Sequence, residues 1–479
     1  MQLVLLAAVV AGAAIRFATL DVQSFWIDEG YTVRMLRGDL GGLIDGVPRT
    51  EQTPHLYYVL AWLWTRPFGT GEVGVRSFSA LLGVLTIPVV FLLGRRLVSE
   101  RAGAVAAALA AFCPLLVWYS QEARSYALLV LLAALSMLLF LRARDERPRG
   151  LLLWAIVSAL ALATHYFAAF VVVPEAAWLL LRARERRAAA LAVAGVGAVG
   201  VALLPLLIHQ QGIQGARFIG GSSLGHRLLQ VPKQFLVGYD TPSEVWLTVA
   251  AATITVAALV LVLTRTDPSE RRGATTAAIA VMAIVGLPLV VAIVGADYFI
   301  SRNVIAGWLP FAVVLAAGLG ARRAPLLGPV LAAGLCAVFL TAVIEVEANA
   351  EFQRDDWRGA ARALGPAEVR RALVVHPLNG LVPLSVYTRG LERFPGGAVP
   401  LSEIDLLAVA DRRAGQSPRP PRPPTPRVFG FKQVLRVDSP TFTLIRLRAN
   451  RLVPFSLFRL TGLKLGDGPS DVLIQRPGG

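Results

Sequence analysis

Residues 77–96 read SFSALLGVLTIPVVFLLGRR, a run without a charged side chain up to Gly94 that ends at Arg95 and Arg96. A run of this length is sufficient to cross the hydrocarbon core of a bilayer. Basic residues directly after such a run are typical of its cytoplasmic end. The stretch therefore predicts a membrane-spanning helix that runs toward the cytoplasm.

The same pattern recurs along the chain and predicts about eleven spans. The first run is expected to be retained, because it lacks the charged region that precedes the core of a signal peptide. With a cytoplasmic N-terminus, the arginine clusters that follow the spans all fall on one side, as the positive-inside rule requires. The predicted spans are residues 1–20, 77–94, 102–118, 125–141, the two arms of a hairpin within 151–181, 188–208, 244–264, 274–295, 303–320 and 325–344, and the arginine clusters begin at Arg95, Arg142, Arg182, Arg265 and Arg322.

The composition supports a polytopic membrane protein. Hydrophobic residues make up 55% and charged residues 16% of the 479 residues, against about 45–50% and about 25% in soluble domains. The net charge of +16 would suggest nucleic-acid binding in a soluble protein. Here the arginines lie between apolar runs, no nucleic-acid-binding motif accompanies them, and Cys113 and Cys336 lie inside apolar runs. We therefore expect no nucleic-acid partner, no disulfide framework and no metal site.

Two segments depart from the spanning pattern. Residues 54–68, PHLYYVLAWLWTRPF, are apolar, but counting them as a span would invert every later loop, so an interfacial helix at the outer face is expected. From residue 346 the apolar runs shorten to strand length, as in LVVH (373–376) and FTLIRL (442–447). The sequence thus predicts a membrane domain over 1–345 and a small extracytoplasmic α/β domain over 346–479, with a stiff proline-rich linker, SPRPPRPPTP, at 417–426.

Polar residues gather at the face opposite the arginine clusters. Carboxylates and histidines at bilayer depth are costly unless a cavity or partner satisfies them, so their clustering indicates a functional site. The members are Asp28, Glu29, His55, the loop YSQEARSY (119–126), His165, His209, Gln210, Asp297 and Arg302.

Each candidate also has a structural interpretation. Asp28 could belong to an interfacial loop pair or cap a helix that starts after Trp26. Glu122 and Arg124 could form a local ion pair, and Arg302 could pair with Asp297. In the same way, His55 and His165 could be hydrogen-bonded interfacial histidines, and Tyr57, Tyr58, Trp62 and Trp64 could form an aromatic belt, although aromatic walls also suit a sugar ring.

Several segments, in this order and spacing, resemble bacterial members of the protein O-mannosyltransferase and aminoarabinose-transferase superfamily, the GT-C glycosyltransferases that use polyprenyl-phosphate sugars. The resemblance covers most of the membrane region and the start of the C-terminal domain. It rests on FWIDEGYTVRML (25–36), QTPHLYYVLAWLW (52–64), GEVGVRSFSALLGVLTIPVVFLLGRRL (71–97), YSQEARSYALL (119–129), THYFAAF (164–170), DYFISRNVIAGWLPF (297–311) and DDWRGAARAL (355–364).

The resemblance implies a GT-C fold with an active site at the outer leaflet. It places the proposed catalytic base of the family at Asp28 and the acidic position of the second outer loop at Glu122. Arg124 and Arg302 are then candidates to contact the lipid phosphate. One departure is His55 after Pro54, where the family often has a second proline.

The chemistry of the residues agrees with this implication. A carboxylate can accept the proton of an acceptor hydroxyl, and cations can stabilise a departing phosphate. The predicted function is transfer of a sugar from a polyprenyl-phosphate donor to an acceptor hydroxyl, with inversion and without a metal or other cofactor. The alternatives are a transporter or flippase for a lipid-linked sugar and an assembly protein. The candidate catalytic residues are Asp28, Glu29 and Glu122, and the candidate substrate-binding residues are His55, Tyr57, Tyr58, Gln121, Arg124, His165 and Arg302.

Overall fold

The computed structural model describes the chain except for residues 146–148, 213–218, 411–419, 464, 467 and 478–479. Arg147 of the predicted second arginine cluster and the first part of the proline-rich segment therefore lie outside the described residues. The chain forms two compact units. The membrane unit comprises Met1–Leu20 and Gly38–Glu345, and the sheet unit comprises Asp21–Arg37 and Val346–Gly479.

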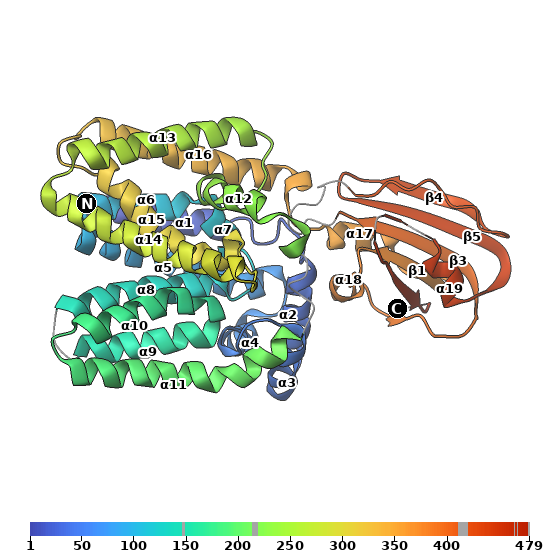
Figure 1. Ribbon diagram of the computed structural model, residues 1–479. Helices are drawn as coiled ribbons and strands as arrows, with labels where there is room; N and C mark the ends of the chain where they lie inside the picture. The colour runs from blue at the N-terminus through green and yellow to red at the C-terminus, as the bar shows by residue number, and fades with distance from the viewer. Residues whose placement is uncertain (146–148, 213–218, 411–419, 464, 467, 478–479) are drawn as a thin grey trace. The chain divides into compact units, whose positions relative to one another are not determined.

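Helices that run side by side make up the membrane unit (Figure 1). Among the described residues, seven helices are long and apolar enough to cross a membrane, or eight if the bent pair α6 and α7 forms one span. All eleven predicted spans are helical, which confirms the polytopic helical fold. The bundle helices are α1 (Gln2–Phe17), α5 (Glu72–Leu97), α6 (Glu100–Phe112), α7 (Pro114–Ser120), α8 (Tyr126–Asp145), α9 (Arg149–Thr164), α10 (Ala169–Arg182), α11 (Arg186–Gln211), α13 (Glu244–Arg265), α14 (Pro268–Ile293), α15 (Trp308–Leu319) and α16 (Leu327–Ala348).

Small residues set the closest approaches between these helices. A Cβ atom on Gly103 of α6 would lie 2.6 Å from the carbonyl oxygen of Phe91 in α5. A Cβ atom on Gly318 of α15 would lie 2.1 Å from the carbonyl oxygen of Ala258 in α13. Helices in a bilayer gain little hydrophobic energy by associating, so backbone contact across small residues is what holds them together.

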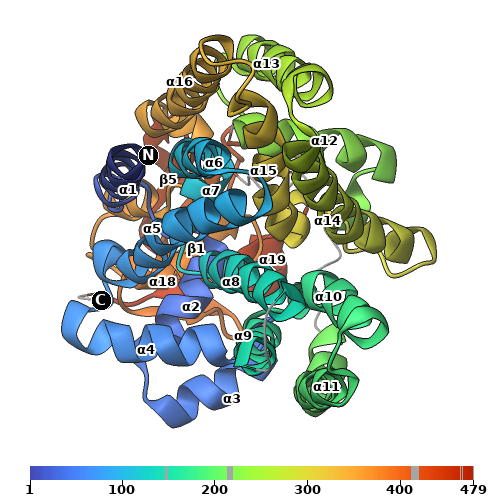
Figure 2. The same ribbon diagram turned by 90° about the vertical axis from the view of Figure 1, so that its left-hand side faces the viewer.

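Two short helices, α3 (Leu40–Thr50) and α4 (Leu56–Phe68), cross the ends of the bundle helices, which Figure 2 shows nearly end-on. With 13 residues, α4 is too short to span the hydrocarbon core. This agrees with the interfacial helix predicted for residues 54–68. A further short helix, α12 (Leu224–Val237), precedes α13.

The span predicted over 102–118 corresponds to two helices, α6 and α7, because the helix breaks at Cys113 and Pro114. The axes of α6 and α7 differ by 57°. Proline has no amide hydrogen to donate to the carbonyl four residues earlier, and its ring clashes with that turn. The break redirects the chain just before the YSQEARSY loop.

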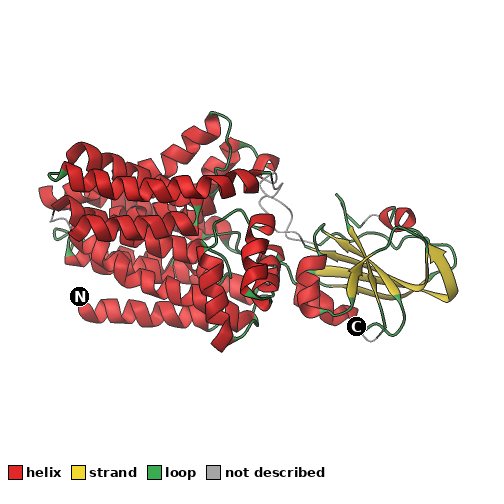
Figure 3. Cartoon of the chain, turned by 90° about the horizontal axis from the view of Figure 1, so that it is seen from below, coloured by secondary structure: helices red, strands yellow, loops and turns green. Residues whose placement is uncertain are grey.

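All strands of the described chain belong to the sheet unit (Figure 3). The six-stranded sheet has the order β2-β6-β1-β3-β5-β4, in which β1 and β3 pair in parallel and the other neighbours are antiparallel. The predicted strand segments 373–376 and 442–447 lie within β1 and β5. The elements are β1 (Arg371–His376), β2 (Leu391–Arg393), β3 (Val399–Val409), β4 (Lys432–Asp438), β5 (Phe442–Phe455), β6 (Asp471–Gln475), α17 (Trp357–Leu364), α18 (Leu381–Tyr387) and α19 (Leu457–Thr461).

Helix α2 (Ile27–Arg37) folds with the sheet unit, although the sequence-based division assigned it to the membrane domain. Ile27 is buried in the same core as Trp357 and Leu384. Gly30 permits the close approach of α18, since a Cβ atom there would lie 3.1 Å from the backbone of Pro383. The segment that carries Asp28 is thus fixed by contacts more than 300 residues away in the sequence.

A buried ion cluster crosses the centre of the sheet. Asp405 of β3 accepts hydrogen bonds from Arg446 at 2.8 and 2.9 Å and lies 3.1 Å from the Arg371 guanidinium. Burial raises the pKa of Asp405 even though both cations lie beside it. The two arginines also donate to the carbonyl oxygen of Leu364, so the cluster joins α17 to three strands.

We predict that Asp405→Ala destabilises the sheet unit by about 3–5 kcal/mol, because it removes the carboxylate nearest to the buried Arg371 and the half-buried Arg446 and leaves both charges to Glu403. Thermal unfolding and hydrogen exchange of β1 and β3 would measure the loss. Glu392→Ala is the matched control, since Glu392 pairs with Arg476 at 3.1 Å on the surface and such pairs contribute little. Equal stability of the two variants would contradict the prediction.

Candidate functional site

The polar loops of the membrane unit converge on one cluster. Its members come from the segment after α3 and the start of α4, from α7, the start of α8 and the loop between them, from the turn between α9 and α10, from the segment after α12, and from the 3-10 helix η3 (Ser301–Gly307). The residues of this cluster are Glu51, Tyr58, Tyr119, Glu122, Arg124, Tyr126, His165, Tyr239 and Arg302.

An ion pair between Arg124 and Glu51 forms the centre of the cluster. Both side chains are nearly buried, with 10% and 1% of their surfaces exposed. Glu51 also accepts a hydrogen bond of 2.7 Å from the Tyr58 hydroxyl, which lies 3.0 Å from the hydroxyl of Thr53. The guanidinium is therefore held in one orientation by a residue 73 positions earlier in the chain.

Glu51 was not among the predicted site residues. The available signal was its position directly before an apolar interfacial helix, in TEQTPHLYY. One interpretation of the sequence paired Glu122 with Arg124. Glu122 is buried, and its backbone carbonyl accepts a 2.8 Å hydrogen bond from the Arg124 amide.

His165 lies in the turn between α9 and α10, where the charges of Arg124 and Arg302 act on it. Burial, assisted by the positive charges of Arg124 and Arg302, lowers the pKa of His165 to about 3. Its ring packs 5.5 Å from the ring of Tyr126, and Nδ1 accepts a hydrogen bond of 3.3 Å from the Phe167 amide. A neutral imidazole with this geometry can bind an uncharged hydroxyl, but it is a poor proton donor at neutral pH.

Arg302 of η3 acts electrostatically on two tyrosines from separate segments, Tyr119 of α7 and Tyr239 after α12. Its positive charge acts on Tyr119, Tyr239 and His165. The hydroxyls of Tyr119 and Tyr239 are hydrogen-bonded to each other. Burial raises the pKa of Tyr239 to about 12, so its hydroxyl stays protonated.

Asp297 pairs with Arg227 of α12, not with Arg302 as one interpretation of the sequence had it. Nη1 of Arg227 donates to Asp297 at 2.7 Å and to the carbonyl oxygen of Phe299 at 2.8 Å, and Nη2 donates to the other carboxylate oxygen. The hydrogen bonds from Arg227 hold the pKa of Asp297 below its ordinary value. This clamp fixes the turn that leads into η3.

Gln210 at the end of α11 fixes the segment around Glu51. Its amide nitrogen donates to the carbonyl oxygens of Val47 and Thr53 at 3.3 and 3.2 Å, and its amide oxygen accepts from Tyr166 at 2.7 Å. The sequence predicted Gln210 at this face without assigning it a role. In the structure it holds the backbone on both sides of Glu51.

Three predicted substrate-binding residues make contacts that shape the surroundings of the cluster. Tyr57 is fully buried, and its hydroxyl lies 2.8 Å from that of Ser79 in α5, which anchors α4. Gln121 donates to the Ile15 carbonyl oxygen at 3.1 Å and to the Thr19 hydroxyl at 2.7 Å. His55 lies at the start of α4, where Nε2 is 3.1 Å from the carbonyl oxygen of Ile44.

Asp28 and Glu29 lie in the first turn of α2, in the sheet unit. The helix begins at Ile27, so Asp28 is not its N-cap, which removes one structural interpretation. A carboxylate in the first turn still interacts favourably with the helix dipole. Glu29 is buried, whereas Asp28 keeps part of its surface exposed.

The cluster combines buried carboxylates, two guanidinium groups, a neutral imidazole and tyrosine hydroxyls. Guanidinium groups in a dry environment suit phosphate oxygens, and hydroxyls and imidazole suit sugar hydroxyls. Within the described residues, no group of three or more His, Cys, Asp or Glu side chains could hold a metal ion.

Comparisons with known proteins agree with this architecture. The family model described as dolichyl-phosphate-mannose-protein mannosyltransferase matches residues 52–209. The crystal structure of ArnT from Cupriavidus metallidurans bound to undecaprenyl phosphate matches with a TM-score of 0.54 at 14% identity, over 92% of this chain and 97% of that one. Its apo state matches with a TM-score of 0.55 at 12% identity and the same coverage.

No curated protein sequence matches the chain. At 14% identity or less, the structural matches show the fold, which is the GT-C fold. The matched family segment contains Glu51's neighbouring helix α4, the YSQEARSY loop and His165. Together, the family match over residues 52–209 and the fold shared with ArnT support a relationship to the GT-C glycosyltransferases.

Proposed function

We propose that the protein is a membrane glycosyltransferase that moves a sugar from a polyprenyl-phosphate donor to an acceptor hydroxyl at the outer face of the cytoplasmic membrane. The observation that carries the proposal is the convergence of Glu122 and Arg124 of one loop with His165 and Arg302 of two other segments of a membrane unit with the GT-C fold. A related fold, ArnT, has been crystallised with undecaprenyl phosphate. That ligand supports a lipid phosphate as the leaving group here.

Arg124 and Arg302 are proposed to bind the donor phosphate. As the anomeric carbon–oxygen bond breaks, negative charge grows on the phosphate, and guanidinium donors in a dry site stabilise that charge. Glu51 keeps Arg124 oriented before the donor arrives. The neutral His165 and the tyrosine hydroxyls can bind the sugar without competing for the phosphate.

Asp28 is proposed as the general base that takes the acceptor proton, with Glu122 as the next candidate. Partial exposure leaves the Asp28 carboxylate accessible to an acceptor, whereas Glu122 and Glu29 are buried. A single base is sufficient for direct displacement, which inverts the anomeric carbon, because a lipid phosphate is a good leaving group.

The decisive experiment supplies the purified protein with polyprenyl-phosphate sugars that carry label in the sugar. A transferase releases the lipid phosphate and passes the label to an acceptor. A flippase moves the intact lipid-linked sugar across a vesicle membrane and leaves the bond unbroken. Transbilayer movement without bond cleavage would refute the proposal.

We predict that α3 and the sheet unit face the outside. In a background without Cys113 and Cys336, a membrane-impermeant thiol reagent applied to intact cells should label Gly41→Cys and Gly397→Cys. Arg322→Cys should be protected, because it lies in an arginine cluster on the cytoplasmic side. Labelling at Arg322 alone would reverse the proposed orientation.

We predict that Asp28→Asn lowers kcat by about 10²- to 10⁴-fold with folding intact, since an amide cannot take a proton. Glu29→Gln should cost less. If Asp28 only complements the helix dipole, Asp28→Asn should reduce stability slightly and leave turnover near normal. Measuring turnover, donor binding and protein yield together separates the two outcomes, and normal turnover would make Glu122 the leading candidate for the base.

We predict that Arg124→Ala and Arg302→Ala each weaken donor binding by about 10- to 100-fold, as expected for loss of hydrogen bonds to a charged group. Lysine at either position should restore only part, because it lacks the planar fork of donors. Arg66→Ala is the matched control, since Arg66 lies over the Trp62 ring on α4. Unchanged affinity and turnover in both alanine variants would exclude these residues from the donor site.

A further inference from the structure

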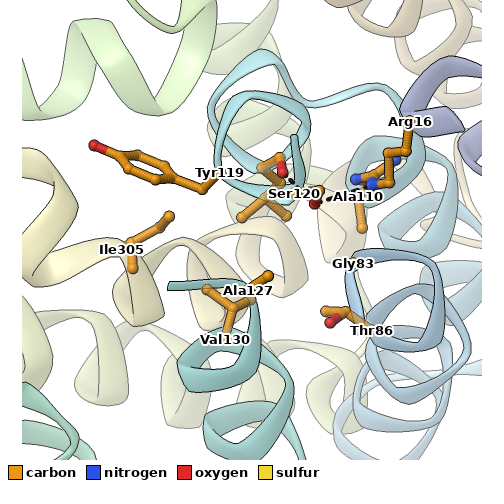
Figure 4. Close-up of a pocket in the computed structure, with 10 residues that line it drawn as sticks. Arg16, Gly83, Thr86, Ala110, Tyr119, Ser120, Ala127, Val130 and Ile305 are labelled. Atoms are coloured by element: carbon orange, nitrogen blue, oxygen red, sulfur yellow. Dashed lines mark hydrogen bonds between the residues drawn. The ribbon is translucent and has the colours of Figure 1, made fainter. Parts of the chain in front are cut away.

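Arg16 is a buried cation in α1 that no part of the proposed chemistry uses. Only 1% of its surface is exposed. Nη2 donates to the carbonyl oxygen of Ala110 at 2.9 Å, and Nη1 donates to that of Ala111 at 2.8 Å. Nε donates to the Ser120 hydroxyl at 3.1 Å (Figure 4). One side chain thus contacts the end of α6 and the end of α7.

The break at Pro114 explains why these carbonyls need an external donor. Pro114 has no amide hydrogen for Ala110, and the amide of Cys113 bonds to Leu109. The last carbonyls of α6 therefore lack helical partners, and no water is present at bilayer depth to replace them. The guanidinium of Arg16 supplies two donors at this point.

The same contact fixes the residues that enter the candidate site. Ser120 accepts from Arg16 and donates to the Leu116 carbonyl oxygen at 2.6 Å. The next residue, Gln121, bonds back to the end of α1 through Ile15 and Thr19. Ser120 and Gln121, the two residues that hydrogen-bond to the end of α1, thus lie immediately before Glu122 in the sequence.

Space for the guanidinium comes from a glycine on α5. A Cβ atom at Gly83 would lie 2.1 Å from the Ser120 hydroxyl oxygen and 2.9 Å from Nε of Arg16. Thr86 and Ile305 line a small cavity beside this contact (Figure 4). Helices α1, α5, α6 and α7 therefore all meet at Arg16.

We propose that Arg16 is a positioning residue for the loop from Gln121 to Arg124, which it places by holding the α6–α7 break. Only the expected loss of kcat rests on the proposed function; the structural role of Arg16 does not. We call the hydrogen bonds from Arg16 to Ala110, Ala111 and Ser120 the Arg16 clamp. Loss of this clamp frees the end of α7 and the backbone of the loop that carries Glu122 and Arg124. A misplacement of about 1 Å can reduce catalysis on the order of 10²-fold.

The test compares Arg16→Met and Arg16→Lys in a Cys336→Ala background, which leaves Cys113 as the single thiol. Cys113 lies at the break itself and is fully buried, so its reaction with a membrane-permeant maleimide reports opening of the clamp. We expect Arg16→Met to expose Cys113 and to lower kcat by about 10²-fold. Lysine should give intermediate values of both, since an ammonium can donate to carbonyls but lacks the fork that also reaches Ser120.

Glu175→Gln is the matched control. Glu175 of α10 is buried and accepts hydrogen bonds from Ser136 at 2.6 Å and Trp154 at 2.8 Å. The control perturbs a buried polar contact elsewhere in the bundle, so it should lower thermal stability while kcat and Cys113 protection stay at the wild-type level.

Wild-type kcat and full Cys113 protection in Arg16→Met would overturn the inference. A loss of kcat in Glu175→Gln that matches the loss in Arg16→Met would do the same, because it would show a general effect of destabilisation. If Arg16→Met does not fold, Arg16→Lys provides the test. Wild-type kcat and wild-type Cys113 protection in Arg16→Lys would then refute the inference. If the wild-type protein moves sugar from no polyprenyl-phosphate donor, the proposed function fails, while Cys113 reactivity still tests the clamp.

Discussion

The absence of water at bilayer depth is the constraint on which the membrane unit depends. Every carbonyl and every charge in that environment needs a partner from the protein itself. The α6–α7 break is possible because Arg16 donates to Ala110 and Ala111. Arg124 is likewise held near the bundle by Glu51, which in turn is held by Tyr58. The polar residues therefore form a connected set of contacts that fixes the loops.

The polar residues fall into two groups: some hold the loops in place, and others are proposed to bind the substrate. Some polar residues, such as Arg227 with Asp297 and Gln210 with Thr53, fix the entry of a loop into the site. Others stand on those loops and have the properties that a phosphate or a sugar requires. The lowered pKa of His165 follows from its burial and from the positive charges of Arg124 and Arg302. A site of this kind is organised before substrate binds, which is what electrostatic stabilisation of a transition state needs.

The proposed base stands on α2, which folds with the sheet unit. The core that contains Trp357 and Leu384 also contains Ile27, the residue before Asp28. Gly30 then allows α18 to approach α2 closely. The conformation of the segment that carries Asp28 is therefore set by the C-terminal part of the chain.

The sequence by itself determined the helical membrane fold, because apolar run length and the side on which arginines gather are local properties that the bilayer selects directly. It also identified Glu122, Arg124, His165 and Arg302 as residues of one face. Only the tertiary structure decided that Arg124 pairs with Glu51, that Asp297 pairs with Arg227, and that Asp21–Arg37 folds with the sheet unit. These pairings join residues 70 or more positions apart, and no periodicity in the sequence encodes them, because they arise from the packing of whole helices and loops.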